Sequence, residues 1–331
     1  MTEPLILIGG IDGGGSNTRA VVLSADGRIK GAGFAGSSTF GVVSHQQTQD
    51  SIRLALAQAF TEAGLRQRPL DALYIGLGGV INDHEKRSMR QLVGMLDMVR
   101  DDRLEIDNDI KPALTGGLAG QAGLVLLVGT GSVCFGIDRY GHEWRAGGWG
   151  ETIDDPGSGY YLGKSALAAT ARAYDGRGPH SPLTTCVYGK MALGNINEIV
   201  WRLSQMDRKD IAAYAKIVMS YAHDHDEVAM RIVREGILEL VLMVETVARK
   251  LDFSAVDIPL TTTGGVFKAG SFFKNLLFEK IVEHVPSVTF VAPRFSPVIG
   301  SVILAGRILG LNLPMDHLSD LVSCITVKER L

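Results

Sequence analysis

Cysteine is scarce in this chain, in which only Cys134, Cys186 and Cys324 are present. Their odd number, wide spacing and lack of a Cys-x-x-Cys pair argue against a disulfide framework and against a zinc knuckle. No apolar run reaches the roughly 20 residues that a membrane-spanning helix needs. Residues 1–4 also lack the basic segment of a signal peptide. We therefore expect a cytoplasmic protein with no membrane partner.

Positive charge is not in excess either, with 33 Lys and Arg residues, 36 Asp and Glu residues and a formal net charge of −3. No long run of Lys and Arg is present, so we expect no nucleic-acid partner. Glycine, in contrast, is abundant, at 40 of 331 residues or about 12%, compared with roughly 7% in typical proteins. The glycines are clustered without a fixed period, which indicates several functional turns rather than a solenoid. The length suggests two domains.

The first glycine cluster lies between an apolar run at residues 5–11 and a second one at 20–23. This pattern predicts a strand, a tight turn and another strand. Glycine lets backbone N–H groups approach an anion, neighbouring hydroxyls add donors, and Asp12 can hold a hydrated divalent cation. An ordinary glycine hairpin, with Asp12 as a turn-forming residue, is the alternative. The residues of this first loop are Asp12, Gly13, Gly14, Gly15, Ser16, Asn17 and Thr18.

The same arrangement returns in the middle of the chain. Residues 123–128 predict a fully apolar strand and residues 133–137 predict another. The turn between them again combines glycines with hydroxyls. Two such hairpins indicate two related halves that face each other across a cleft. The second hairpin turn consists of Gly129, Thr130, Gly131 and Ser132.

The segments around these hairpins predict an α/β protein. Strands and helices alternate over residues 28–108, as a mixed sheet covered by helices requires. A helix is expected at 114–122, and residues 182–252 are expected to be helical. The glycine-dense segment 145–163 predicts a loop that lines a site. Within it, Trp149 is either a stacking platform for a sugar or a core aromatic residue, and we favour the core.

Asp109 follows a short predicted strand at 104–106, and the residues alone leave its carboxylate open to a catalytic or a capping role. Phosphoryl transfer to a hydroxyl needs alignment, charge neutralisation and one carboxylate that accepts the hydroxyl proton. The alternative is that Asp109 caps the helix that would begin just before Pro112.

Seven glycine- and aspartate-rich motifs occur in one order over nearly the whole chain. Together they resemble the N-acetylglucosamine kinase branch of the BadF/BadG/BcrA/BcrD ATPase family, which belongs to the actin, sugar kinase and heat-shock ATPase superfamily. The motifs are Asp12 to Thr18, Asn108-Asp109, Gly129 to Ser132, Gly147 to Gly150, Asp155 to Gly159, Asp175 to Pro179 and Gly264 to Val266.

The resemblance implies an α/β fold with two ribonuclease-H-like, actin-like ATPase domains and a nucleotide and substrate cleft between them. The N-terminal domain would span residues 1–112, joined by the C-terminal helix 312–331. The C-terminal domain would span residues 113–311 and contain the helical insertion 182–252.

The resemblance also assigns roles to single residues. The first loop and the second hairpin turn would bind the phosphates of ATP, and Gly264 and Gly265 the adenosine. Asp109 would be the catalytic base, and Asp12 would hold Mg²⁺ through water. The implied substrate-binding residues are Ser38, Thr39, Asn108, Asp109, Thr130, Gly147, Gly148 and Asp155.

By the same resemblance, the protein would use ATP and Mg²⁺ to phosphorylate an amino sugar, N-acetylglucosamine at its C6 hydroxyl, and would be a homodimer. Phe40 stands where the family commonly has a sugar-binding Asn, and Pro156 where it commonly has Glu. A glucosamine kinase or an N-acetylmuramate kinase therefore remains an alternative. Two alternatives belong to other functional classes. One is an ATP-driven iron-sulfur activator of a dehydratase, and the other is a non-catalytic sugar sensor.

Overall fold

The structure is a computed structural model that describes residues 5–253 and 257–328. The chain forms two compact units. The first comprises Met1–Gln121 and Ala292–Leu331, and the second comprises Ala122–Val291. Each unit contains one five-stranded sheet with helices on its faces.

The sheet of the first unit has the strand order β3-β2-β1-β4-β5. Strands β1, β2 and β3 are antiparallel, whereas β4 and β5 run parallel to β1. The first predicted hairpin is present, since Gly13 of β1 pairs with Thr18 of β2. The bounds are β1 Leu7–Gly13, β2 Thr18–Ser24, β3 Lys30–Ala35, β4 Ala72–Leu77 and β5 Leu104–Asn108.

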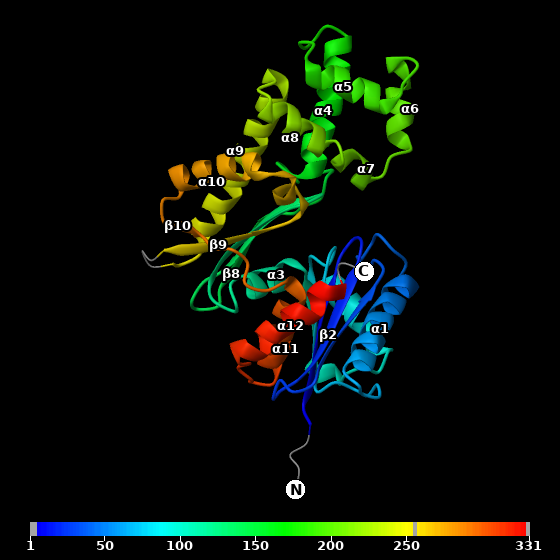
Figure 1. Ribbon diagram of the computed structural model, residues 1–331, viewed down its shortest axis with the longest axis vertical. Helices are drawn as coiled ribbons and strands as arrows, with labels where there is room; N and C mark the ends of the chain where they lie inside the picture. The colour runs from blue at the N-terminus through cyan, green and yellow to red at the C-terminus, as the bar shows by residue number, and fades with distance from the viewer. Residues whose placement is uncertain (1–4, 254–256, 329–331) are drawn as a thin grey trace. The chain divides into compact units, whose positions relative to one another are not determined.

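Helices cover both faces of this sheet, as Figure 1 shows for α1 and α11 on either side of β2. Alternate residues of β1 therefore enter different cores. Leu7 and Ile11 pack with α1, whereas Ile8 packs with α11. The helices are α1 His45–Glu62, α2 Asp83–Gly94, η1 Asp101–Arg103, α3 Ile110–Gly117, α11 Pro297–Ile308 and α12 Met315–Lys328.

The sheet of the second unit has the order β10-β9-β6-β7-β8. The second predicted hairpin joins β6 to β7, with Val128 opposite Ser132. Strand β9 runs parallel to β6, so the ends of both strands reach the same edge of the sheet. The bounds are β6 Gly123–Val128, β7 Ser132–Ile137, β8 Glu143–Gly147, β9 Ile258–Thr263 and β10 Val288–Phe290.

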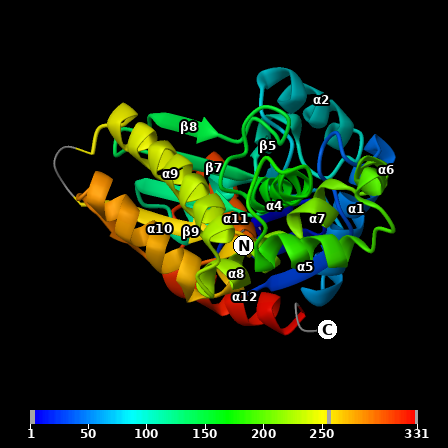
Figure 2. The same ribbon diagram turned by 90° about the horizontal axis from the view of Figure 1, so that it is seen from above.

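The long helix α9 organises the core of the second unit. It packs on β7, β8 and α8, and Figure 2 shows it lying beside α10. Its buried face carries apolar residues from Val228 to Val247. The helices are α4 Gly159–Tyr174, α5 Pro182–Met191, η2 Ile196–Glu198, α6 Ile199–Ser204, α7 Arg208–Ala212, α8 Ala215–His223, α9 Glu227–Lys250, η3 Gly265–Ala269 and α10 Ser271–His284.

The division into units differs from the sequence-based domain boundaries at two places. The expected boundary at 112/113 falls inside α3, and α11 lies in the first unit rather than in the second. Both differences have one cause, because α3 and α11 pack tightly against each other. A Cβ atom at Gly116 would lie only 2.5 Å from the Ser296 carbonyl oxygen. Residues 1–4, 254–256 and 329–331 of the expected ranges lie outside the described residues.

Two local expectations were wrong. The segment expected to be a loop begins with strand β8, which continues the β6–β7 hairpin as a third antiparallel strand. Helix α3 begins at Ile110 rather than at residue 114. Across the described residues, none of the helices is both long enough and apolar enough to cross a bilayer.

Gly10 sets the distance between β1 and α11, because a Cβ atom there would lie 2.5 Å from the backbone nitrogen of Val302. We expect Gly10→Ala to lower the free energy of unfolding by about 1–3 kcal/mol, the usual effect of overpacking a core. Urea unfolding measures this change. Gly94→Ala is the control, because a Cβ atom there meets nothing within 4 Å. Equal stability of the two variants would contradict the tight β1–α11 contact.

Candidate active site

The first loop is a short turn whose tip is exposed. The Gly14 N–H donates to the Asn17 carbonyl oxygen at 3.0 Å, and the Ser37 hydroxyl donates to the Gly14 carbonyl oxygen at 3.1 Å. Gly15, Ser16 and Asn17 reach solvent. Gly13 has no room for a side chain, because a Cβ atom would lie 2.5 Å from Leu77 Cδ2. Hydrogen bonds and close packing therefore hold the base of the turn, whereas its tip is exposed.

Asp12 lies at the end of β1 with only 12% of its side chain exposed. Its Oδ2 atom is 3.3 Å from Nη1 of Arg19, which is its cross-strand partner in β2. Sequence analysis missed Arg19 as a residue of this site. The register of the predicted hairpin could have found it, because opposite charges that face each other on neighbouring strands attract.

The Asp109 carboxylate does not cap the helix that follows it, although Asp109 is the residue just before α3. Asn108 supplies that contact instead, since its Oδ1 atom accepts a hydrogen bond from the Ile110 N–H at 3.0 Å. Burial, together with the negative charge of Asp12, raises the pKa of Asp109 from 3.8 to about 7. Two predicted carboxylates are thus brought close together in the first unit.

Ser38 and Thr39 lie differently beside these carboxylates. Ser38 is fully buried, and its hydroxyl lies 2.8 Å from that of Thr18, so it supports the first loop. The Thr39 hydroxyl makes no hydrogen bond within the described part of the chain. A Cβ atom at Gly78 would lie 3.3 Å from Asp109 Oδ2 and 3.4 Å from Thr39 Oγ1. The Thr39 hydroxyl and the Asp109 carboxylate therefore border the same glycine.

The second hairpin turn is attached to the N-terminus of α4. The Gly159 N–H donates to the Gly129 carbonyl oxygen at 2.8 Å, and the Tyr160 N–H donates to the Thr130 carbonyl oxygen at 3.2 Å. The Ser132 hydroxyl donates to the Pro156 carbonyl oxygen at 2.6 Å. These bonds join the turn to the motif from Asp155 to Gly159, which lies about 25 residues further along the chain.

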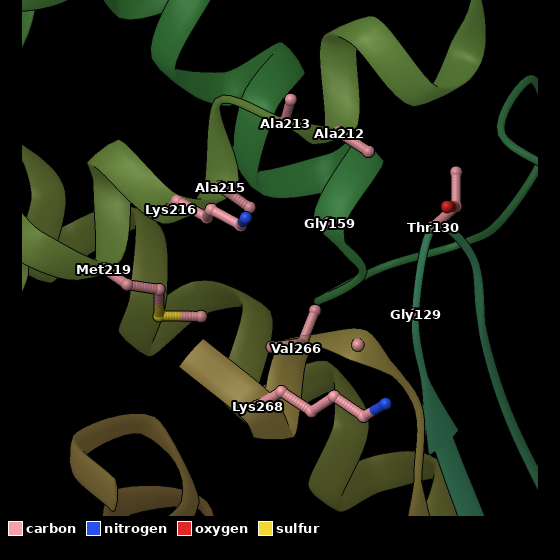
Figure 3. A pocket seen from close by; sticks show the side chains of 11 residues that line it. Gly129, Thr130, Gly159, Ala212, Ala213, Ala215, Lys216, Met219, Val266 and Lys268 are labelled. Carbon is pink, nitrogen blue, oxygen red and sulfur yellow. The ribbon is translucent and has the colours of Figure 1, made fainter. Parts of the chain in front are cut away.

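A pocket of about 420 Å³ lies against this turn in the second unit. Gly129 and Thr130 line it together with Gly265, so two of the predicted nucleotide-binding segments meet there (Figure 3). Gly264 adopts a φ of 115°, which favours glycine, and a side chain there would strike the Val128 carbonyl group.

Lys216 and Lys268 approach this pocket from opposite walls, α8 and η3, as Figure 3 shows. Sequence analysis did not single out either residue. Lys216 lies on a helix that carries no glycine motif, so its position depends on how α8 folds back toward η3. No sequence signal identified it.

Asp155 is buried below the second hairpin turn, with 4% of its side chain exposed. Its Oδ1 atom accepts a hydrogen bond from the Ser132 N–H at 3.3 Å, and its Oδ2 atom accepts one from Arg208 Nη2 at 2.5 Å. Burial raises the pKa of Asp155 despite these two contacts. Glu151 also reaches the Arg208 guanidinium, at 3.2 Å.

Gly147, the last residue of β8, and Gly148 form a bend, with φ values of 76° and 71°. The preference for Trp149 as a core residue was wrong. The residue is 54% exposed, and the Arg145 guanidinium stacks on its ring, 4.6 Å from the ring centroid.

The predicted site residues therefore form two groups, one in each unit. The first unit brings together Asp12 with its loop, Ser38, Thr39, Asn108 and Asp109. The second unit brings together Gly129 to Ser132 with Asp155, and with Gly264 and Gly265. The roles of these residues remain predictions.

The donor chemistry of the first group fits Mg²⁺. This ion is commonly held by one or two carboxylates, while water and substrate phosphates complete its octahedron. Asp12 and the exposed loop beside it offer such a carboxylate. The described residues contain no group of three or more His, Cys, Asp or Glu side chains placed to form a metal cage, an arrangement that Mg²⁺ at a phosphate site does not require.

A family model matches residues 10–305, which cover most of the chain. The chain belongs to the BadF/BadG/BcrA/BcrD ATPase family. The family predicted from the seven motifs is thus confirmed. The two mixed five-stranded sheets also confirm the predicted fold class, the two-domain fold of actin-like ATPases and sugar kinases.

This member of the BadF/BadG/BcrA/BcrD family is similar to named sugar kinases. An N-acetylmuramic acid/N-acetylglucosamine kinase of Clostridium acetobutylicum is 27% identical over 89% of this chain and 97% of the relative. An N-acetyl-D-glucosamine kinase of Dictyostelium discoideum is 26% identical over 89% and 96%. The structure of a candidate N-acetylglucosamine kinase from Chromobacterium violaceum matches with a TM-score of 0.73 and 25% identity, over 91% of this chain and 99% of that one.

The raised pKa of Asp109 predicts a pH-dependent cost to stability. Below about pH 4 the carboxyl group is protonated in both the folded and the unfolded chain. Between pH 4 and 7 only the unfolded chain loses the proton, so stability falls as the pH rises, and above pH 7 the cost is complete. We expect Asp109→Asn, which mimics the neutral group, to raise the melting temperature at pH 8 but not at pH 4.

The rise at pH 8 should be roughly 3 °C or more, because about 1 kcal/mol shifts the melting temperature of a domain of this size by ~2–4 °C. Scanning calorimetry at both pH values measures it. Asp97→Asn is the control, because Asp97 is exposed and has a φ of 51° that Asn tolerates. An Asp109→Asn protein that is less stable than the wild type at pH 8 would contradict the raised pKa.

Proposed function

We propose that the protein transfers the γ-phosphoryl group of ATP to a hydroxyl group of an amino sugar, with N-acetylglucosamine and its C6 hydroxyl as the main candidate. The relatives named as N-acetylglucosamine kinases, which match almost end to end, support this choice. The single observation that carries the proposal is Asp109, a partly buried carboxylate whose pKa is raised to about 7 and whose side chain makes no capping hydrogen bond to α3.

In this proposal Asp109 is the general base. A base is most effective when its pKa lies near the working pH, because it is then both ionised and basic enough to take a proton. Asp109 accepts the proton of the sugar hydroxyl as that oxygen forms a bond to the γ-phosphorus and the bond to the ADP oxygen breaks. The Thr39 hydroxyl, which borders the same glycine, positions the sugar.

The nucleotide occupies the pocket of the second unit. Gly264 and Gly265 allow the adenosine to approach the backbone, and the Gly129 to Ser132 turn faces the phosphates. Lys216 and Lys268, one on each wall, place positive charge beside them. Mg²⁺, held by Asp12 through water, would neutralise charge on the β- and γ-phosphates.

The residues that contact the sugar determine which sugar is phosphorylated. Ser38, Asn108, Thr130, Gly147, Gly148 and Asp155 complete the proposed sugar-binding set. Phe40, which replaces an amide, stacks on His45 with ring centroids 5.9 Å apart and packs against the core of the first unit. A sugar hydroxyl would therefore lose a hydrogen-bond partner at this position, which keeps glucosamine and N-acetylmuramate as alternative substrates.

The proposal extends to ATP and Mg²⁺ as cofactors, a homodimer, a cytoplasmic location and no nucleic-acid partner. It is favoured over an iron-sulfur activator because Cys134 is fully buried in β7 and Cys186 lies on α5, where neither thiol occupies a glycine-rich loop. A non-catalytic sugar sensor would not need a carboxylate tuned like Asp109.

ADP release tests the function directly. Wild-type protein with Mg²⁺ and ATP is given glucosamine, N-acetylglucosamine, N-acetylmuramate, N-acetylmannosamine or glucose. We expect ADP release that depends on an amino sugar, and a product heavier by one phosphoryl group. Silence across the panel with intact ATP binding would contradict an amino sugar kinase and favour a sensor.

The role of Asp109 is tested with the same assay. We expect Asp109→Asn to lower turnover by roughly 100-fold or more, the usual contribution of a general base, while ATP affinity changes little. Asp97→Asn, which removes one exposed acid from the same unit, should retain turnover. Near-normal turnover of Asp109→Asn would show that another group accepts the proton.

The two lysines provide a prediction about nucleotide binding. We expect Lys216→Met and Lys268→Met each to weaken ATP binding about 10- to 100-fold, because each removes a charged partner of the phosphates. Calorimetry with a non-hydrolysable ATP analogue measures this change. Lys164→Met, an exposed position on α4 outside the pocket, should bind normally. Unchanged affinity in both pocket variants would contradict this location for the nucleotide.

A further inference from the structure

Arg208 has no role in the reaction described above, yet its guanidinium lies at the proposed sugar site of the second unit. Its Nη2 atom donates to Asp155 Oδ2 at 2.5 Å, and its Nε atom lies 3.2 Å from Glu151. A Cβ atom at Gly131 would lie 2.7 Å from Arg208 Nη2 and 2.9 Å from Asp155 Oδ2. The absence of a side chain at Gly131 therefore makes room for this ion pair beneath the hairpin turn.

The position of Arg208 is set by the cap and the packing of helix α7. Arg208 is the first residue of α7, and Asp207 caps this helix by accepting hydrogen bonds from the N–H groups of Lys209 and Asp210 at 2.7 and 2.9 Å. Helix α7 also packs against α4, the helix that carries the second hairpin turn at its N-terminus. The guanidinium is thus fixed relative to the turn, although 39% of the Arg208 side chain is exposed.

The Asp155 carboxylate needs such a partner. It is 4% exposed, and burial alone favours the protonated form. The charged groups around it are Arg208 on α7 and the acids Glu151 and Asp154 of its own loop. The hydrogen bond from the Ser132 N–H of β7 lowers the pKa of Asp155 most, and the charge of Arg208 lowers it next. Arg208 is the cation that opposes both desolvation and the two neighbouring acids.

The hydrogen bonds also leave capacity for a ligand. A carboxylate oxygen has two acceptor sites. Oδ1 accepts from the Ser132 N–H and Oδ2 from Arg208, so each oxygen can accept one further O–H donor. Two hydroxyls on neighbouring carbons of a sugar ring present such a pair of donors.

We propose that Arg208 is a positioning residue for sugar binding, which holds the Asp155 carboxylate ionised and oriented to accept hydrogen bonds from two neighbouring sugar hydroxyls. This inference rests on the proposed function, because it assigns the sugar to the site of Asp155. Arg208 acts through Asp155 and takes no part in the transfer of the phosphoryl group.

Steady-state kinetics of Arg208→Met, Arg208→Lys and Lys209→Met test this role. In Arg208→Met we expect the sugar KM to rise about 10-fold or more, as expected for loss of a charge-assisted contact, with kcat and the ATP KM within about threefold. The acidic limb of kcat/KM for the sugar should move to higher pH, because Asp155 then holds its proton more tightly. Arg208→Lys should restore part of the loss.

Lys209→Met is the matched control, because it removes one positive charge from the next position of the same helix, where the side chain is exposed. It should leave the sugar KM and the pH profile unchanged. An unchanged sugar KM and pH profile in Arg208→Met would overturn the proposal, and so would an equal effect of Lys209→Met.

A second measurement needs no turnover. Carboxyl ¹³C NMR titration of the wild type and of Arg208→Met, assigned with Asp155→Asn, should show a higher Asp155 pKa in the variant. If Arg208→Met does not fold, Arg208→Lys is titrated in its place. If the wild type phosphorylates no sugar, the proposed function fails, and the titration still decides the role of Arg208. An unchanged Asp155 pKa would overturn it.

Discussion

The close approach of backbone and side chains beneath two hairpin turns is the constraint on which this structure depends. Gly13 has no room for a Cβ atom because the Leu77 side chain lies below it, and Gly131 has none because the Asp155–Arg208 pair lies below it. Both turns come at strand ends, where the sheet delivers polar groups to one edge. Larger residues at Gly13 and Gly131 would push the acids away from the turns. Glycine at these two positions therefore allows the acids to lie close to the turns.

Burial then gives the acids of each unit their different properties. Burial and the charge of Asp12 both raise the pKa of Asp109, whereas at Asp155 the Ser132 N–H and Arg208 oppose the rise in pKa that burial causes. A carboxylate without a cation is prepared to take a proton, and a carboxylate with a cation is prepared to stay ionised and accept hydrogen bonds. The same side chain thus fits a base in the first unit and a ligand for hydroxyls in the second.

The sequence was sufficient for the fold class, the family and the two hairpins, because glycine clusters and apolar runs are local signals. It placed Asp12 and Asp109 at the ends of strands and Asp155 in the loop before α4, as the structure has them. It could not show α11 packing on α3, since that contact joins segments far apart in the chain. Strand β8 and the exposure of Trp149 were missed for a local reason, because the glycine-dense segment indicated a loop. Arg208 and Lys216 were missed because they come from helices of the insertion that carry no motif of their own. Lys268 was missed because it lies just beyond the Gly264 to Val266 motif, on η3.

The central claim is that a sugar hydroxyl, activated by Asp109, receives a phosphoryl group from ATP. Phosphorus NMR of the reaction with Mg²⁺, ATP and N-acetylglucosamine tests it most directly, because it distinguishes a sugar phosphate from free phosphate. The account predicts a phosphomonoester coupled to the two protons at C6, formed in step with ADP by the wild type and absent with Asp109→Asn. Inorganic phosphate as the sole new signal, or an equal yield of phosphomonoester from the variant, would contradict it.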